Sequence, residues 1–314
     1  MTAPRAIGSL TRKTLWFGAY LVTCLAVFWP PVRDLLHLSL SEDTYSHILL
    51  VPFITAGLIL MNRHLLPESA AGSPWAGAIV FCSGLLLFGL GWQFGSHLAA
   101  GKPLAFAILP LVVLVWAGFL FFYGARPFRS LQFPLYFLLL AVPLTQSLID
   151  VLIEWLRLGS SEVAYWLFRA TATPVFRRGF IFAVPGATID VAPECSGIRS
   201  AIALLITCLL AGYLFLRTKW ARFVLLAATV PVLVIKNGIR IVTLTLLATH
   251  VDPSFLTGKF HHQGGFVFFI IGLLILWPVL RWLQAKEAKS GRRRSIPPRP
   301  ASGAPHAPSA ATRP

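Results

Sequence analysis

Charged residues are scarce in this sequence. Only 12% of the 314 residues are charged and 56% are hydrophobic, whereas a soluble domain is about 25% charged. No long polar stretch exists from which a separate soluble domain could be built. The composition therefore excludes a soluble globular protein and predicts an all-α polytopic membrane protein.

Cysteine is also rare. Cys24, Cys82 and Cys208 lie within apolar runs, where a free thiol behaves as a small hydrophobic side chain. The four cysteines show no spacing that indicates a disulfide framework. Cys195 alone has polar, turn-forming neighbours, so the sequence indicates a reactive role for this cysteine.

Several functional motifs are missing as well. The sequence has no glycine-rich phosphate loop, no nucleotide motif and no paired carboxylates, so we expect no cofactor. Cys195, His250, His261 and His262 could supply a zinc site, but they lack a regular ligand spacing, and we expect no metal. The net charge of +16 does not indicate a nucleic-acid partner, because the basic residues are spread over short loops and the C-terminal tail. Cytoplasmic loops of membrane proteins carry such an excess, so we expect contact with membrane lipid.

About eight apolar stretches approach the length of about 20 residues that a membrane span needs. They cover residues 14–32, 46–61, 75–96, 103–123, 130–149, 197–216, 223–248 and 264–280. The first is followed by further spans and has no small-residue cleavage site, so we expect an anchor and not a cleaved signal peptide. We assign 1–283 to one integral membrane domain and expect the basic, Pro-rich segment 284–314 to be a disordered cytoplasmic tail.

Two smaller elements are predicted before the sixth span. The stretch 150–173 carries five charged residues among apolar residues at helical spacing. This pattern favours an amphipathic helix along the outer membrane surface over a ninth span. In the segment 178–191, β-forming residues flank Pro185 and Gly186, which predicts a small outer β-hairpin.

Eight spans place both termini on one side of the membrane. With the N-terminus inside, the inner segments hold most of the 27 lysines and arginines, as the positive-inside rule requires. We therefore expect a multi-pass protein of the bacterial inner membrane with both termini in the cytoplasm. The start of the sixth span and the gap between the seventh and eighth then face the periplasm.

Cys195 is the first candidate for chemistry. Pro193 and Gly197 flank it where the sixth span begins, and the positive end of a helix dipole favours the nucleophilic thiolate. Arg199, one turn further, could assist the thiolate or bind a substrate carboxylate. The alternative interpretation is a buried structural thiol.

The seventh span carries a second candidate group. Ionisable residues within a span are costly and mark functional sites by default. Lys236 and Arg240 are four residues apart and share a helix face with Asn237 close by. Arg240 could stabilise a thiolate or an oxyanion. Snorkelling to the outer surface is the alternative for Arg240, but it does not account for the deeper Lys236.

Histidines near the outer surface complete the candidate site. His261 and His262 begin the eighth span, and an imidazole beside a thiol can act as general acid and base. His47 begins the second span on the same side. It could line the site or serve as an interfacial anchor, and the same alternative applies to His261 and His262.

Three motifs carry a family resemblance. The run APECSGIRS at 192–200, the run NGIR at 237–240 and the pair Phe260-His261 followed by Gly265 resemble the exosortase and archaeosortase family of membrane cysteine transpeptidases. The segment 45–52 is similar to that family's early span, and the resemblance covers roughly residues 44–283. It implies Cys195 as nucleophile, Arg240 as oxyanion or thiolate stabiliser and His261 as acid and base. The family has a histidine four residues before a glycine, which His261 satisfies, but His262 stands beside it.

The resemblance also implies an activity. Such enzymes recognise a C-terminal sorting signal on exported proteins, made of a short motif (often Pro-Glu-Pro), a transmembrane helix and a basic cluster. They cleave near the motif and pass the new C-terminus to an acceptor, in connection with exopolysaccharide and cell-surface sorting. Attack by Cys195 would give a thioester, and water as acceptor would make the enzyme a protease. A transporter and a non-catalytic member of a polysaccharide assembly complex remain as alternatives.

Overall fold

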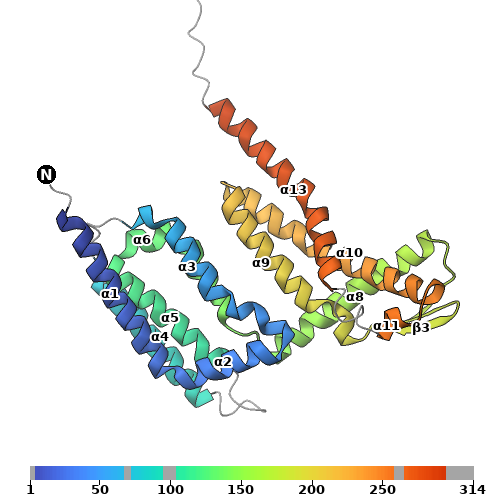
Figure 1. Cartoon of the computed structure of the whole chain (residues 1–314), viewed down its shortest axis with the longest axis horizontal. Helices are drawn as coiled ribbons and strands as arrows, with labels where there is room; N and C mark the ends of the chain where they lie inside the picture. The colour runs from blue at the N-terminus through green and yellow to red at the C-terminus, as the bar shows by residue number, and fades with distance from the viewer. Residues whose placement is uncertain (1–3, 67–71, 95–103, 258–264, 295–314) are drawn as a thin grey trace, which may run out of the picture.

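The protein folds almost entirely into helices (Figure 1). The computed structural model describes residues 4–66, 72–94, 104–257 and 265–294. Its first half contains the elements α1 (Pro4–Val27), α2 (Trp29–Ser41), η1 (Asp43–Leu49), α3 (Val51–Met61), η2 (Arg63–Leu65), α4 (Pro74–Phe94), α5 (Ala105–Tyr123), α6 (Ala125–Ser130), α7 (Gln132–Phe137) and η3 (Leu138–Ala141). The second half contains α8 (Gln146–Ala170), β1 (Phe176–Arg178), β2 (Ile181–Val184), β3 (Ala187–Asp190), η4 (Pro193–Ser196), α9 (Ile198–Phe215), α10 (Lys219–His250), α11 (Ser254–Thr257) and α13 (Gly265–Arg294).

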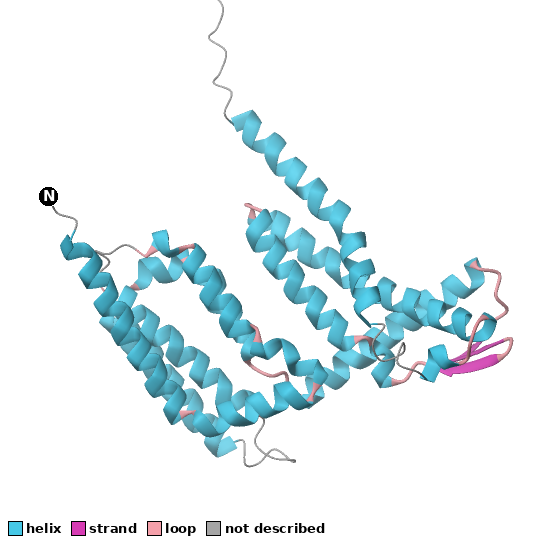
Figure 2. Ribbon diagram, in the orientation of Figure 1, coloured by secondary structure: helices cyan, strands magenta, loops and turns pink. Residues whose placement is uncertain are grey.

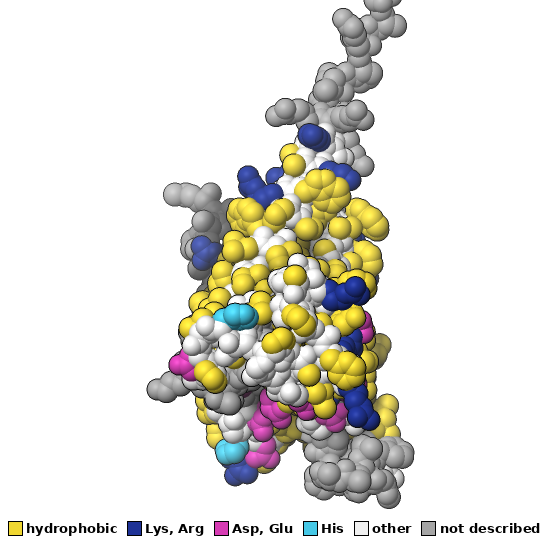
Figure 3. All heavy atoms as spheres, turned by 90° about the vertical axis from the view of Figure 1, so that its right-hand side faces the viewer, with side chains coloured by type: hydrophobic (Ala, Val, Ile, Leu, Met, Phe, Trp, Pro, Cys, Tyr) yellow, Lys and Arg dark blue, Asp and Glu magenta, His cyan; other side chains and the backbone are white. Residues whose placement is uncertain are grey.

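The helices have the length and apolarity of a multi-pass membrane protein. Within the described ranges, six helices could cross a membrane, and two bent helix pairs raise the number to eight if each pair is one span. Exposed apolar side chains such as Phe53 (76%) and Trp75 (83%) suit contact with lipid tails. In Figure 3, hydrophobic side chains cover the middle of the visible face, and acidic side chains gather toward its lower end.

In each bent pair, a helix break lies inside a stretch that was predicted as one continuous span. The span expected at 14–32 ends early, because α1 stops at Val27 and α2 leaves at 80°. Pro30 and Pro31 stand in the first turn of α2, where proline can begin a helix but cannot continue the preceding one. The span expected at 130–149 is interrupted after Ala141, and α8 departs at 95° beyond Pro143.

The helix predicted at 150–173 is present as α8, a 25-residue helix. The predicted hairpin is also present, but it is part of a three-stranded antiparallel sheet in the order β1-β2-β3 (Figure 2). Pro185 and Gly186 form the β2–β3 turn as expected. The additional strand β1 follows from Gly179, whose φ of 62° allows a second tight turn.

The sheet is fastened to α8 by two arginines. Arg157 donates from Nε to the carbonyl oxygen of Val191 at 2.7 Å, and its guanidinium lies 4.0 Å from the centre of the Phe180 ring. Arg177 forms an ion pair with Glu162 at 2.7 Å. The chain that leads from β3 to η4 is therefore held against α8 at Val191.

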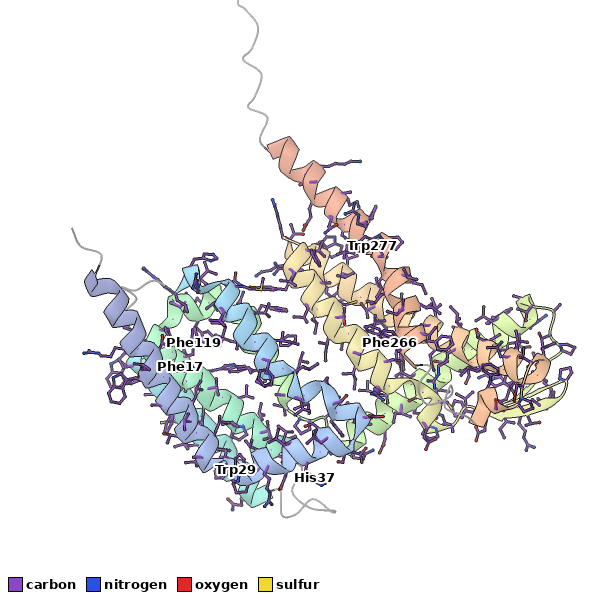
Figure 4. All side chains as sticks on the ribbon, viewed as in Figure 1. Phe17, Trp29, His37, Phe119, Phe266 and Trp277 are labelled. Carbon is purple, nitrogen blue, oxygen red and sulfur yellow. The ribbon has the colours of Figure 1, made fainter. Side chains whose placement is uncertain are left out.

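Two groups of helices form the two sides of the molecule (Figure 1). Helices α1, α4 and α5 pack together on one side. There the rings of Phe17 and Phe119 pack edge to face, with their centroids 6.0 Å apart (Figure 4). Helices α9, α10 and α13 pack on the other. Helix α7 contacts the second group where the Phe133 ring stacks on the Tyr213 ring of α9, with the ring centroids 4.1 Å apart.

The start of α1 and the end of α13 lie at the same end of the molecule in Figure 1. Helix α13 continues to Arg294, so the first part of the tail expected at 284–314 is helical, while 295–314 lie outside the described residues. Glu287 explains this extension, because its carboxylate accepts hydrogen bonds from the backbone N–H of Arg217 and of Thr218. This contact ties α13 to the α9–α10 turn.

Candidate active site

Cys195 lies in the short helix η4, directly before α9. Its backbone N–H donates to the carbonyl oxygen of Ala192 at 2.8 Å. Gly197 follows with a φ of 71° and forms the N-cap of α9. This left-handed conformation favours glycine, so the sequence around the cysteine forms a tight turn that ends in a helix N-terminus. The Cys195 side chain is partly exposed and packs against an apolar cluster formed by α8, the sheet and α10.

Helix α10 brings two buried polar side chains to this turn, and both are 1% exposed. Asn237 donates from Nδ2 to the carbonyl oxygen of Cys195 at 3.1 Å and to Ser160 Oγ of α8 at 3.0 Å. Lys236 donates from Nζ to Ser200 Oγ at 2.6 Å. Ser200 donates in turn to the carbonyl oxygen of Gly197 at 3.0 Å.

The close packing of α8 and α10 makes these contacts possible. A Cβ atom on Gly238 would lie 2.5 Å from the Val163 side chain, so a larger residue would push the helices apart. Small residues at helix crossings allow this approach in membrane proteins. Asn237, next to Gly238 in the chain, can therefore reach both α8 and the cysteine turn.

Arg240 lies close to Cys195. The two residues share the lining of a small cavity of about 30 Å³ with the end of β3 and with Leu244. They are near enough for the guanidinium charge to act on the sulfur. Burial of the Cys195 sulfur favours the neutral thiol, and the positive charge of Arg240 opposes this by favouring the thiolate.

A larger cavity of about 780 Å³ adjoins the turn. This volume falls within the usual range of ligand pockets, about 300–1,000 Å³. Its lining comes from six elements and comprises Asp43, Thr44, Ile153, Pro193, Glu194, Gly197, Ile198, Arg199, Ser200, Ala203, Arg240, Gly265, Phe266 and Phe269. Phe266 lies at the lower end of α13 in Figure 4. Arg240 lines both cavities, whereas Cys195 lines the small one and not the larger one.

Arg199 lies at the rim of the larger cavity. Its guanidinium forms an ion pair with Asp43 of η1 at 2.6 Å, and both side chains are more than half exposed. Exposed pairs of this kind stabilise a fold by about 0–1 kcal/mol. The contact joins α9 to η1, and it directs the Arg199 charge toward Asp43.

Of the candidate histidines, the structure describes His47 and His250. His261 and His262 lie outside the described residues, but Gly265 lines the larger cavity. His47 is within 3.1 Å of the Thr44 carbonyl oxygen through Nδ1 and lines neither cavity. His250 is exposed at the end of α10, and the described part of the chain contains no group of three or more potential metal ligands.

The sequence did not single out Ser160 and Ser200. Both bond to the polar residues of α10. A buried lysine and asparagine require hydrogen-bond partners on neighbouring helices, which is the signal that could have found them. Which serine meets which residue depends on the register between the helices.

Comparison with known protein families decides the identity. The transmembrane exosortase family matches residues 38–278, which includes η1, the cysteine turn, α9, α10 and the first part of α13. The chain belongs to this family. Comparisons with curated proteins and with solved structures give no match.

The exosortase resemblance carried by the three motifs is thus confirmed over most of the chain. Membership of the exosortase family, together with the apolar helices, makes the protein a multi-pass membrane protein. It also indicates a membrane transpeptidase that acts in protein sorting.

Proposed function

We propose that this exosortase is a cysteine transpeptidase that cleaves the C-terminal sorting signal of exported proteins through a thioester on Cys195. The observation that carries the proposal is the approach of Arg240 to Cys195 in a turn beside a cavity of about 780 Å³. These features support the proposal because they bring a thiol and a positive charge next to a cavity of the size that ligands occupy.

The proposed first step uses the thiolate that Arg240 and the start of α9 favour. The sulfur attacks the scissile carbonyl carbon, and the Arg240 guanidinium stabilises the oxyanion that forms. The carbon–nitrogen bond then breaks, and the leaving amine takes a proton, a role we assign to His261. The acyl group remains on Cys195 as a thioester. An amine or hydroxyl acceptor releases it, whereas water would give simple hydrolysis.

The proposed substrate carries a Pro-Glu-Pro-like motif, a transmembrane helix and a basic cluster. Its helix would pack against the exosortase within the bilayer and present the motif at the larger cavity. The basic residues at the ends of the spans support an orientation with both termini in the cytoplasm of a bacterial inner membrane. The site would then face the periplasm, where exported proteins are joined to the surface or to exopolysaccharide.

The test is a Cys195→Ser variant co-expressed with a reporter that ends in such a signal. We expect cleavage of the reporter to stop, because a hydroxyl is a far weaker nucleophile than a thiolate at neutral pH. Cys82→Ser is the matched control, since Cys82 is an exposed thiol on α4. Cleavage by Cys195→Ser at the wild-type rate would favour a transporter or a scaffold, neither of which needs the thiol.

A further inference from the structure

The cysteine turn contains a second pair of reactive groups, for which the proposed first step has no use. Lys236 Nζ lies 2.6 Å from Ser200 Oγ. Lys236 is 1% exposed, and the larger cavity is lined by Ser200 and not by Lys236. The serine hydroxyl therefore connects a buried amine with the space in which a substrate would bind.

The surroundings of Lys236 favour an uncharged amine. Among the described residues, no carboxylate lies within ion-pair distance of Nζ. A Cβ atom on Gly272 of α13 would lie 3.2 Å from Lys236 Cδ and 3.0 Å from a methyl carbon of Leu204, so the stem of the lysine is packed among apolar groups. The positive Arg240 stands one helical turn away. Burial without a counter-ion and a nearby like charge both disfavour the ammonium form.

We infer that Ser200 and Lys236 form a proton relay for the acceptor in the second half of the transfer reaction. Ser200 is the group that would touch the acceptor, and Lys236 acts through it. The inference rests on the proposed function, because it requires a thioester on Cys195. It adds a step to that function, namely how the incoming amine or hydroxyl loses its proton.

The step balances in protons and electrons. The acceptor nitrogen or oxygen attacks the thioester carbonyl and forms a new carbon–nitrogen or carbon–oxygen bond. The carbon–sulfur bond breaks, and its electron pair leaves with the Cys195 sulfur as a thiolate beside Arg240. The acceptor proton passes to Ser200 Oγ while the Ser200 proton passes to Lys236 Nζ. The proton on Lys236 then returns through Ser200 Oγ to water in the cavity. From water it passes to His261, which gave a proton to the leaving amine in the first step.

The resting geometry allows this relay with little movement. Ser200 donates to the Gly197 carbonyl oxygen at 3.0 Å, and a hydroxyl hydrogen can rotate to another acceptor while the oxygen stays in place. Arg240 lines both the cavity of Cys195 and that of Ser200. An acceptor in the larger cavity would thus contact both Ser200 and Arg240.

The alternative is that the Lys236–Ser200 bond only holds α9 against α10. The two roles differ in the step that they affect. A structural bond supports the whole turn, so its loss slows thioester formation and thioester decay alike. A relay serves only the decay, and it requires a group at position 236 that can accept a proton.

The experiment separates the two steps. Purified wild type and variants in lipid nanodiscs are mixed with a reporter that ends in Pro-Glu-Pro, an apolar helix and an arginine cluster, with glycinamide as acceptor. Samples are quenched in acid, and the thioester is followed as an adduct that hydroxylamine removes. We expect Ser200→Ala and Lys236→Met to form the adduct within about threefold of the wild-type rate and to lose it roughly 100-fold more slowly, the scale of general-base catalysis.

Two conservative variants sharpen the result. Ser200→Thr retains the hydroxyl and should lose the adduct near the wild-type rate. Lys236→Arg keeps a charge and a donor but cannot accept a proton, so it should be as slow as Lys236→Met. Restoration by Lys236→Arg, equal slowing of both steps, or wild-type decay in Ser200→Ala would each overturn the relay. Absence of any adduct in the wild type would instead contradict the thioester mechanism itself.

Discussion

At the residue scale, the conformation of the cysteine turn depends on Gly197. Its φ of 71° is unfavourable for other residues, and a Cβ atom there would lie 2.7 Å from Asn237 Oδ1. Asn237 holds the carbonyl group of Cys195. A side chain at position 197 would therefore strain the backbone and also displace the residue that fixes the nucleophile.

We expect Gly197→Ala to abolish reporter cleavage while the protein is still inserted. The left-handed backbone costs an alanine about 1–2 kcal/mol, and the collision with Asn237 adds to this. Gly179→Ala is the matched control, because Gly179 has a φ of 62° and open space around its Cα. It should lose only the backbone cost of about 1–2 kcal/mol, measured by thermal unfolding, and keep cleavage. Equal activity of the two variants would contradict a special role for the Gly197–Asn237 contact.

A second residue-scale prediction concerns the two adjacent histidines. We expect His261→Ala to abolish cleavage of the reporter and His262→Ala to retain most of it, since the proposed acid and base is His261. Both variants should reach the membrane in wild-type amounts, which blotting of the membrane fraction checks. The opposite pattern would transfer the role to His262.

Part of the site could be predicted from the residues alone. Cys195 and Arg240 each stand near one end of a predicted span, and counting the spans places those ends on one side of the membrane. Ser160 and Ser200 could not be predicted in this way. Serine occurs in many helices, and its partner is set by the rotation and depth of the neighbouring helix, which hydropathy does not report.

At the element scale, Arg157 connects α8 to the chain that enters the cysteine turn. Its Nε bonds to Val191, four residues before Cys195, and its charge lies over Phe180. A hydrogen bond to a charged donor contributes about 1.5–3 kcal/mol. The residue should thus stabilise both the sheet and the position of the nucleophile.

We expect Arg157→Met to destabilise the protein by about 1–3 kcal/mol and to lower the rate of reporter cleavage in parallel. Methionine keeps much of the apolar packing but removes the donor. Arg169→Met is the control, because Arg169 is an exposed residue of the same helix and its guanidinium lies near the rings of Tyr165 and Trp166. Thermal unfolding in detergent measures the difference, and identical unfolding of the two variants would contradict the anchoring role.

The elements themselves were only partly predictable. Helices α4, α5, α9 and α10 begin and end within a few residues of the predicted spans, because lipid demands long apolar runs. The bends after Val27 and after Ala141 were missed, since apolar residues continue across both. Hydropathy measures how apolar a stretch is and does not report a bend, although prolines stand beside both breaks, at Pro30 and Pro31 and at Pro143. Strand β1 has three residues and is too short for an alternating pattern to reveal.

At the scale of the whole molecule, α10 connects two positions that we expect to lie on opposite sides of the membrane. Lys219 begins this 32-residue helix, and Ser254 follows its far end in α11. A helix of this length extends roughly 48 Å, enough to cross a bilayer. The two positions therefore report on opposite sides of the membrane.

We expect Ser254→Cys to react with a membrane-impermeant maleimide in intact spheroplasts, and Lys219→Cys to react only after the membrane is opened. Both changes are made in a background in which the native cysteines are replaced by serine. Both sites are exposed, so access and not burial decides labelling. The reverse pattern would place the cysteine turn in the cytoplasm and contradict a role in sorting exported proteins.

The position of Arg240 between the two cavities has a pharmacological consequence. A compound that fills the larger cavity meets a guanidinium before it meets sulfur. A weak electrophile joined to a carboxylate or phosphonate would be drawn in and oriented by that charge, while neutral or cationic warheads of equal reactivity would gain nothing from it. Selective covalent inhibitors of this enzyme should thus be anionic, and their advantage should disappear when Arg240 is replaced by methionine.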